Sequence, residues 1–597
     1  MFLFLFIIYF VLAWRLARKI LPKIFSVDKK IIAILSGFAP LFILGPVANI
    51  FTAWFALNNY TIVLAGLLSL ALLTAASRLL KNFPDLTAEE VAADSGVKFA
   101  NWLWVIFGLA LMAGWVMIFT HISGVRLISP WQILPAGQLI FIFIAVAIVV
   151  WAIMSQEKFW RVLVAIIFLS LLVHSYLLVY QNGFGGDRFR HLGSEQRILS
   201  ELEYQPTLLA KDIWWQKIGP ISVPQVLIDS AKLSYGTIWS LEAIMSKVTG
   251  LGVFEINRFF LPLLFSIFLP LLAVIIALLL WPSRQFALFS GLMTISLYLL
   301  QYYGAQGLPA GYGLLWLAFY LALLIAYLKF PKRPLLIILI GGLCLMYFNY
   351  SLAFILAAIA LVVALVGQKS KILSGAAAAI ALVGLVFLDY LSSSQIDFSL
   401  RKIYDAWTSG NLLYFSSGIK LSQWIGRGQV ILDLFIAVVF VLIIVYLLYV
   451  FFKKDKSWRL LSYLFVATIG AYLLSWLMFS GEHSLARRIT LFAAWPLIFL
   501  LAHGLARISN SKKAALAVTA ILPLIMVFNY WSGPVLTVAV SDRDLSKAQA
   551  MWQDLRGQSN YCVRDDLEVI LALEYFSAKD FQETINNQNC EKLKIKN

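Results

Sequence analysis

The chain has 597 residues, of which 61% are hydrophobic and only 13% are charged, and its mean hydropathy is +0.86. A soluble chain of this length could not cover so much apolar surface, so the composition excludes a soluble globular protein and makes the lipid bilayer its solvent. The formal net charge of +17 would suggest nucleic acid as a partner in a soluble protein. Here it is typical of the Lys and Arg excess of cytoplasmic membrane loops, so no nucleic-acid partner is predicted.

Hydrophobic runs long enough to cross a ~30 Å hydrocarbon core occur along almost the whole chain. They predict an all-α polytopic membrane protein with about sixteen transmembrane helices. The predicted spans are 1–14, 31–50, 60–77, 100–119, 135–154, 162–181, 259–281, 286–304, 311–328, 334–348, 351–367, 372–391, 428–452, 459–479, 489–506 and 514–531. The first is short, and 334–348 with 351–367 could be one helical hairpin or a re-entrant pair.

Basic residues alternate strongly from one connection to the next. Alternate connections carry 24 Lys and Arg residues, whereas the short connections of opposite phase carry only Arg126, Arg487 and Arg488. This bias predicts that the basic connections are cytoplasmic and that loops 182–258 and 392–427 and the tail from 532 are exported. We therefore expect a multi-pass protein of the inner (plasma) membrane whose active face is exported. Residues 1–14 lack a basic n-region and a small-residue cleavage site, so they are expected to stay in place.

Three segments are predicted. Residues 1–160 form a five-helix membrane block, 161–531 form a membrane core that carries both long exported loops, and 532–597 form a small exported α or α/β appendage. Within the first exported loop, 191–202 and 238–248 are expected to be helices lying along the membrane surface. Cys344 lies in an apolar run and is expected to pack, whereas Cys562 and Cys590 share the exported tail, where a disulfide is chemically allowed.

The first exported loop opens on Gly-Gly-Asp187-Arg188-Phe189-Arg190-His191. Titratable residues are costly near lipid, so an acid where a span leaves the bilayer is a candidate functional residue. Asp187 could act as a general base on a sugar hydroxyl, and His191, four residues later on the same helical face, could orient it. Arg188 or Arg190 could hold a phosphate. The alternative is a surface helix whose first-turn Asp favours the helix dipole.

The same loop carries aromatic residues and further acids. Trp214, Trp215, Tyr235 and Trp239 are suited to stacking on a sugar or to resting at the headgroup level. Glu201 and Glu203 are candidate oxygen ligands for a divalent cation, although acids two residues apart diverge on a helix, which favours ordinary solvation. No other cofactor is indicated, because zinc-ligand spacing, a Walker-type phosphate loop and a Gly-x-Ser-x-Gly elbow are all absent from the sequence.

A second candidate site is Gly-Glu-His483-Ser-Leu-Ala-Arg487-Arg488, directly before the span 489–506. Two arginines in a short exported loop depart from the charge rule. Planar bidentate donors suit a lipid-borne phosphate or pyrophosphate, with His483 beside them. The alternative is pairing with Glu482 or with ordinary lipid headgroups. Tyr302, Tyr303, Tyr312, Tyr347 and Tyr350 flank short exported turns and are expected to form an aromatic belt.

From about residue 161 the layout resembles the GT-C superfamily of polytopic membrane glycosyltransferases. In that family an acid lies in the first large exported loop, soon after a transmembrane helix, and Asp187 in GGDRFRH occupies the matching place. The late basic EHSLARR loop is also similar. Where the family usually has a second acid beside the first, this chain has Arg188 and Phe189, and five spans precede the core, which implies an extended bacterial member.

The resemblance implies inverting transfer of a sugar from a polyprenyl-phosphate donor to a glycan, lipid or protein acceptor. Asp187 would deprotonate the acceptor, Arg487 and Arg488 would stabilise the departing lipid phosphate, and Trp214 or Trp215 would stack on a sugar. Two other classes fit the same layout. One is a transporter or flippase of a lipid-linked substrate, and the other is a non-catalytic membrane assembly protein.

Overall fold

The computed structural model describes residues 2–578 with the exception of 53–54, 87–98, 128, 186, 202–214, 219–220, 225–229, 393–394, 397, 400, 402–444, 447, 450–454, 481–483, 509–511, 532–538 and 557–564. The described chain is almost entirely helical. Its first part forms α1 (Phe2–Ile20), α2 (Lys29–Thr52), α3 (Asn59–Leu79), α4 (Trp102–Thr120), α5 (Gly137–Met154) and α6 (Phe159–His174), with 3-10 turns at Leu21–Lys23, Pro130–Gln132 and Tyr176–Val179.

The middle of the chain contains α7 (Asp187–Leu199), the hairpin of β1 (Trp215–Ile218) and β2 (Ile221–Pro224), α8 (Ser230–Thr249) and α9 (Val253–Leu280). Next come α10 (Arg284–Met293), α11 (Tyr298–Ala305), α12 (Pro309–Lys329), α13 (Arg333–Tyr347), α14 (Ser351–Lys369) and α15 (Lys371–Ser392). The last elements are β3 (Gln395–Ile396), α19 (Lys456–Met478), β4 (Phe479–Ser480), α20 (Ser484–Ile508), α21 (Lys512–Trp531), α22 (Asp542–Leu555) and α23 (Leu567–Phe576). The two-residue strands β3 and β4 pair antiparallel.

The described residues contain twelve helices that are long and apolar enough to cross a membrane, or thirteen if the bent pair α10 and α11 is one span. This agrees with the predicted all-α polytopic membrane protein. Every predicted span except 428–452 falls on a helix or on that pair, and 428–452 lies almost wholly outside the described residues. Helix α1 carries basic residues in its last turn, and α13 has only 15 residues, so neither belongs to the twelve.

The predicted continuous span 286–304 is broken. Helices α10 and α11 meet at 62°, where Thr294, Ile295 and Ser296 interrupt the helical hydrogen-bond pattern. The Thr294 hydroxyl bonds the Gly291 carbonyl at 2.7 Å, and the Gln301 side chain donates to the Ile295 carbonyl at 2.6 Å. Polar side chains thus satisfy backbone groups that a straight helix would have satisfied itself.

One continuous apolar core runs from Tyr9 in α1 to Tyr530 in α21. Helix α2 packs on α8 and α9, and α21 packs on α5, so helices from the start and the end of the chain lie beside the central ones. Nothing in these contacts tests the predicted division at residues 160 and 531, which stays a prediction. A second, smaller core joins α22 and α23 to α7 through residues that include Phe189, Leu192 and Leu573.

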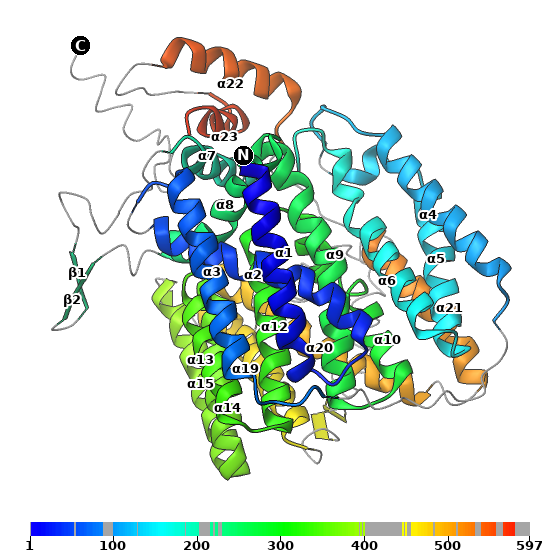
Figure 1. Ribbon diagram of the computed structural model, residues 1–597. Coiled ribbons are helices and arrows are strands. Elements are labelled where there is room, and N and C mark those ends of the chain that lie inside the picture. Colours follow the sequence, from blue (N-terminus) through cyan, green and yellow to red (C-terminus); the bar gives the residue numbers. More distant parts are fainter. Residues whose placement is uncertain are drawn as a thin grey trace.

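Helices α7, α8, α22 and α23 lie at the end of the bundle where the N-terminus also lies, which we call the α7 end (Figure 1). The starts of α9 and α12 meet there through Asn257 and Gly307, and the starts of α14 and α20 lie beside Tyr235 of α8, so the C-termini of α12 and α14 lie at the opposite end. The parts that the charge pattern predicts to be exported thus gather at the α7 end, as far as they are described. Which side of the membrane this end faces stays a prediction.

Three local expectations were wrong, and one element was missed. The helix expected at 238–248 on the membrane surface is α8, and every residue from Thr237 to Ile244 is at most 2% exposed, because α2 and α7 cover it. The hairpin β1–β2 was not expected. Cys344 is exposed on α13 rather than packed inside. Two of the expected belt tyrosines, Tyr312 and Tyr350, are buried in the interior.

Candidate functional site

The turn before α7 depends on glycine. Gly183 and Gly185 both have positive φ, at +77° and +90°, and α7 begins directly after this turn at Asp187. A Cβ atom on Gly183 would collide with the guanidinium group of Arg188. The glycines therefore allow the chain to leave α6, reverse and place the first turn of α7 against its own preceding loop. The Asp187 side chain lies outside the described part, so its role as a base stays a prediction.

Arg188 is directed into the protein. Its Nε donates to Asn257 Oδ1 at 2.7 Å, and its Nη2 donates to the Phe254 carbonyl at 3.0 Å. Its guanidinium carbon also lies 4.8 Å from the centre of the Phe254 ring. Burial lowers the pKa of Arg188 to about 10, so it stays charged at neutral pH. These contacts fasten α7 to the start of α9, and the predicted phosphate contact of Arg188 is not tested by them.

Two glutamates that the sequence analysis did not select lie beside this arginine. Glu195 of α7 and Glu242 of α8 are both 0% exposed. Asn257 joins them, because its Nδ2 lies 2.8 Å from Glu242 Oε2 and 3.4 Å from Glu195 Oε1. The same amide nitrogen also donates to the Gly307 carbonyl at 3.1 Å. We call Arg188, Glu195, Glu242 and Asn257 the buried cluster.

The chemistry of the buried cluster requires a shared proton. The two carboxyl groups lie within hydrogen-bonding reach of each other. Glu195 Oε2 and Glu242 Oε1 have no other hydrogen-bond partner in the described chain. Two ionised carboxylates would repel, whereas one proton between them supplies the missing donor and leaves one negative charge to balance Arg188. Desolvation by burial raises the pKa of both groups, which agrees with a protonated pair.

His191 lies in an aromatic pocket formed by α8. The indole Nε1 of Trp239 donates to His191 Nδ1 at 3.1 Å, and the Tyr235 ring contacts the imidazole edge to face, with centroids 5.1 Å apart. Burial, reinforced by the charges of Arg488 and Arg190, lowers the pKa of His191 to about 3. The ring is therefore neutral at physiological pH and accepts at Nδ1, which suits a positioning residue.

Arg190 faces the C-terminal segment. Its Nε lies 3.3 Å from Glu574 Oε2 of α23, and the Glu574 side chain is only 5% exposed. The tail thus covers α7 through an ion pair as well as through the second core. Two further pairs, from Arg126 to Asp544 at 3.5 Å and to Glu568 at 3.1 Å, join the tail to the loop after α4. The predicted phosphate contact of Arg190 is not tested by this pairing.

The two candidate sites lie close together in the structure. Arg488, at the start of α20, is exposed and donates a hydrogen bond to Tyr235, and Tyr350 and Tyr303 lie close enough to interact with its charge. The same charge reaches His191, and the rings of Tyr235 and Tyr350 lie 6.5 Å apart. Residues that are about 300 positions apart in the sequence therefore surround one region at the α7 end.

Several predicted site residues cannot be compared with the structure. Trp214 and His483 lie outside the described residues, as do the side chains of Trp215 and Arg487. Glu201 pairs with Lys247 at 2.7 Å, whereas Glu203 lies outside the described part. The described residues contain no group of three or more His, Cys, Asp or Glu side chains placed to hold a metal ion.

The buried cluster had a signal in the sequence. Arg188, His191, Glu195 and Leu199 recur at intervals of three and four, which places them on one helical face. Glu242 stands between Leu241 and Ala243 in a segment rich in apolar residues, where an acid is unusual. The pairing of Glu195 with Glu242 and Asn257 could not be predicted, because three separate helices supply the residues.

Comparison with known protein families, with curated proteins and with solved structures found no match for this chain. The likeness to membrane glycosyltransferases therefore rests on the layout and on the two motifs, and its consequences are proposals.

Proposed function

We propose that this chain is an integral-membrane glycosyltransferase that moves a sugar from a polyprenyl-phosphate donor to an acceptor at the α7 end, on the exported face. The observation that carries the proposal is that Arg488 donates a hydrogen bond to Tyr235, whose ring contacts His191. His191 lies one helical turn after Asp187. The displacement of a lipid phosphate needs a base for the acceptor and a cation for the departing phosphate. An acid and an exposed arginine, each at a helix end and from two distant motifs, can supply them.

The reaction is a single displacement. The Asp187 carboxylate takes the proton of the acceptor hydroxyl, and the acceptor oxygen attacks the anomeric carbon. The bond from that carbon to the phosphate oxygen breaks, so the lipid phosphate leaves with the electron pair. Arg488, held by Tyr235, stabilises the negative charge that develops there. The buried cluster positions α7 and hence Asp187. The neutral His191 ring contacts Tyr235 and Trp239 and so keeps the Tyr235 side chain in place.

The test is sugar transfer by the purified full-length protein in detergent, with a panel of polyprenyl-phosphate sugars as donors. We expect Asp187→Asn to lower turnover by about 10²–10⁴ with donor binding retained. Arg488→Gln should lower turnover strongly, and Arg488→Lys should restore part of it because the charge returns without the planar fork.

The matched control is Asp554→Asn, which removes an exposed acid of α22 at the same end and should leave turnover unchanged. Transfer that survives Asp187→Asn would place the base elsewhere. Failure of the wild-type protein to transfer from any donor that it binds would refute the enzyme proposal.

A transporter of a lipid-linked substrate is the second candidate, and two observations favour it. Broken spans such as α10 and α11 are typical of transporters, and a proton-sharing carboxyl pair could couple transport to protons. Reconstituted vesicles distinguish the two. A transporter should move a fluorescent lipid-linked sugar between leaflets in a manner that Glu242→Gln abolishes, without any change in the sugar's covalent linkage.

A further inference from the structure

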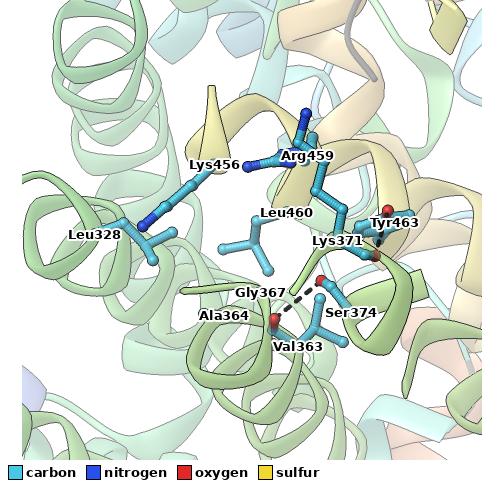
Figure 2. A pocket seen from close by; sticks show the side chains of 10 residues that line it. All are labelled: Leu328, Val363, Ala364, Gly367, Lys371, Ser374, Lys456, Arg459, Leu460 and Tyr463. Atoms are coloured by element: carbon cyan, nitrogen blue, oxygen red, sulfur yellow. Dashed lines mark hydrogen bonds between the residues drawn. The ribbon is translucent and has the colours of Figure 1, made fainter. Parts of the chain in front are cut away.

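A pocket at the opposite end of the bundle is lined by positive charge. It lies between the C-terminal ends of α12 and α14 and the first turns of α15 and α19. Lys371 of α15 and Lys456 and Arg459 of α19 line it, and its lining includes no acid. Figure 2 shows these cationic side chains around the pocket together with Ser374 and Tyr463.

Arg459 is the unusual member. It is only 9% exposed, and its Nη1 is fully covered without a hydrogen-bond partner in the described part of the chain. A buried guanidinium donor without an acceptor costs free energy, on the order of 1–3 kcal/mol or more for a charged group. A bound anion would supply the missing acceptor and remove this cost.

The neighbouring groups do not supply the missing acceptor. The described residues contain no ion pair that involves Lys371, Lys456 or Arg459. Asp455, the nearest acid in sequence, caps α19 by accepting from the backbone N–H groups of Ser457 and Trp458, both at 3.0 Å. The Ser374 hydroxyl donates to the Val363 carbonyl at 3.1 Å, which leaves it as an acceptor only.

We propose that this pocket binds a phosphate group, with Arg459 as its buried donor and Lys371 and Lys456 as flanking cations. The pocket is far smaller than a drug-sized pocket, so any group that enters it is small. Because the pocket lies where membrane helices end, the phosphate of an anionic phospholipid is one source, and free phosphate is the other.

The experiment measures the thermal unfolding and ligand affinity of the full-length protein in a nonionic detergent. The probes are dihexanoyl phosphatidylglycerol, dihexanoyl phosphatidylcholine and sodium phosphate. We expect phosphatidylglycerol to raise the melting temperature, and Arg459→Gln to weaken its binding at least tenfold. Tighter binding of the anionic lipid than of phosphate identifies a headgroup site, whereas equal or tighter binding of phosphate identifies a free-anion site.

Two further variants test whether a loss of binding is specific to the pocket. Arg333→Gln, which removes an exposed arginine at the same end of the bundle, should leave binding unchanged. Lys371→Gln alters an exposed side chain, so it should fold normally and still weaken binding. Without ligand, Arg459→Gln should melt at the same or a higher temperature than the wild type, because an unsatisfied charge is removed. Three results would each overturn the proposal. They are the absence of binding of any probe by the wild type, an equal loss of binding in Arg333→Gln and Arg459→Gln, and destabilisation of Arg459→Gln without ligand.

Discussion

At the scale of single residues, the buried cluster is the feature with the largest consequence. Arg188, Glu195, Glu242 and Asn257 lie away from water, where an unpaired charge costs several kcal/mol. One proton shared by the two glutamates removes the repulsion between them and leaves a net charge that matches the arginine. We therefore expect the contacts of the cluster between α7, α8 and α9 to depend on pH.

The first prediction concerns pH. Burial raises the pKa of Glu195 and Glu242 above the ~4.3 of an unfolded glutamate. Their contribution to stability is therefore fully present below that value and is lost as pH rises through the raised pKa. His191 acts in the opposite sense, because its pKa is lowered to about 3. Its contribution to stability is therefore present above the unfolded pKa of ~6.5 and is lost as pH falls towards 3.

Between pH 7 and 8, where His191 is mostly neutral in both states, the melting temperature should therefore fall as pH rises. One additional proton held by the folded chain across that unit corresponds to about 1.4 kcal/mol. Glu242→Gln should flatten the fall, because its amide donates to Glu195 without titrating, whereas Glu201→Gln should not. An unchanged slope in Glu242→Gln would contradict the shared proton.

The second prediction concerns the turn before α7. Gly183→Ala should lower the free energy of unfolding by more than about 1 kcal/mol, because a left-handed φ is strained for alanine and because Cβ would displace Arg188. Gly341→Ala is the control, since its Cβ would meet nothing within 4 Å and alanine favours the helix. Denaturation in mixed detergent measures both, and equal stability of the two variants would refute the steric argument.

At the scale of elements, α7 is held on three sides. Helix α8 covers it through His191 and Trp239, α9 through Arg188, and α23 through the second core and the Arg190–Glu574 pair. The predicted catalytic helix is thus covered by protein on these three sides. Its orientation depends on the C-terminal tail, which is far away in sequence.

The third prediction tests this dependence. Leu573→Ala should cost about 2–5 kcal/mol locally, because Leu573 is fully buried, and should speed amide hydrogen exchange in both α23 and α7. Leu567→Ala, on the same helix but 48% exposed, should change exchange little. Faster exchange in α23 alone would mean that the tail does not support α7.

The elements themselves were largely predictable. Apolar runs located nearly every described span, because the length of a spanning helix is set by the bilayer. Helix α7 begins at Asp187, where the glycine turn ends, which places His191 one turn later as expected. The hairpin was missed although Gly219-Pro220 separates its two strands, a dipeptide that marks turns. Periodicity alone could not reveal that α8 is covered on all sides.

At the scale of the whole molecule, the fourth prediction concerns topology. In a variant whose three cysteines are replaced by serine, Ser200→Cys should react with a membrane-impermeant maleimide in intact cells, and Lys332→Cys should react only after lysis. The two positions lie at opposite ends of the bundle, after α7 and before α13. Labelling of both positions from the same side would contradict the orientation that the charge pattern predicts.

The amino-acid sequence by itself determined the class of protein, the approximate helices and the end of the bundle where polar loops gather, because hydrophobicity and charge act locally along the chain. Only the tertiary structure decided which polar residues meet. Arg488 with Tyr235, Glu195 with Glu242 and Arg459 with Lys371 are each brought together by packing between different helices. The physical reason is that burial and pairing of charges depend on packing between helices, which no local pattern specifies.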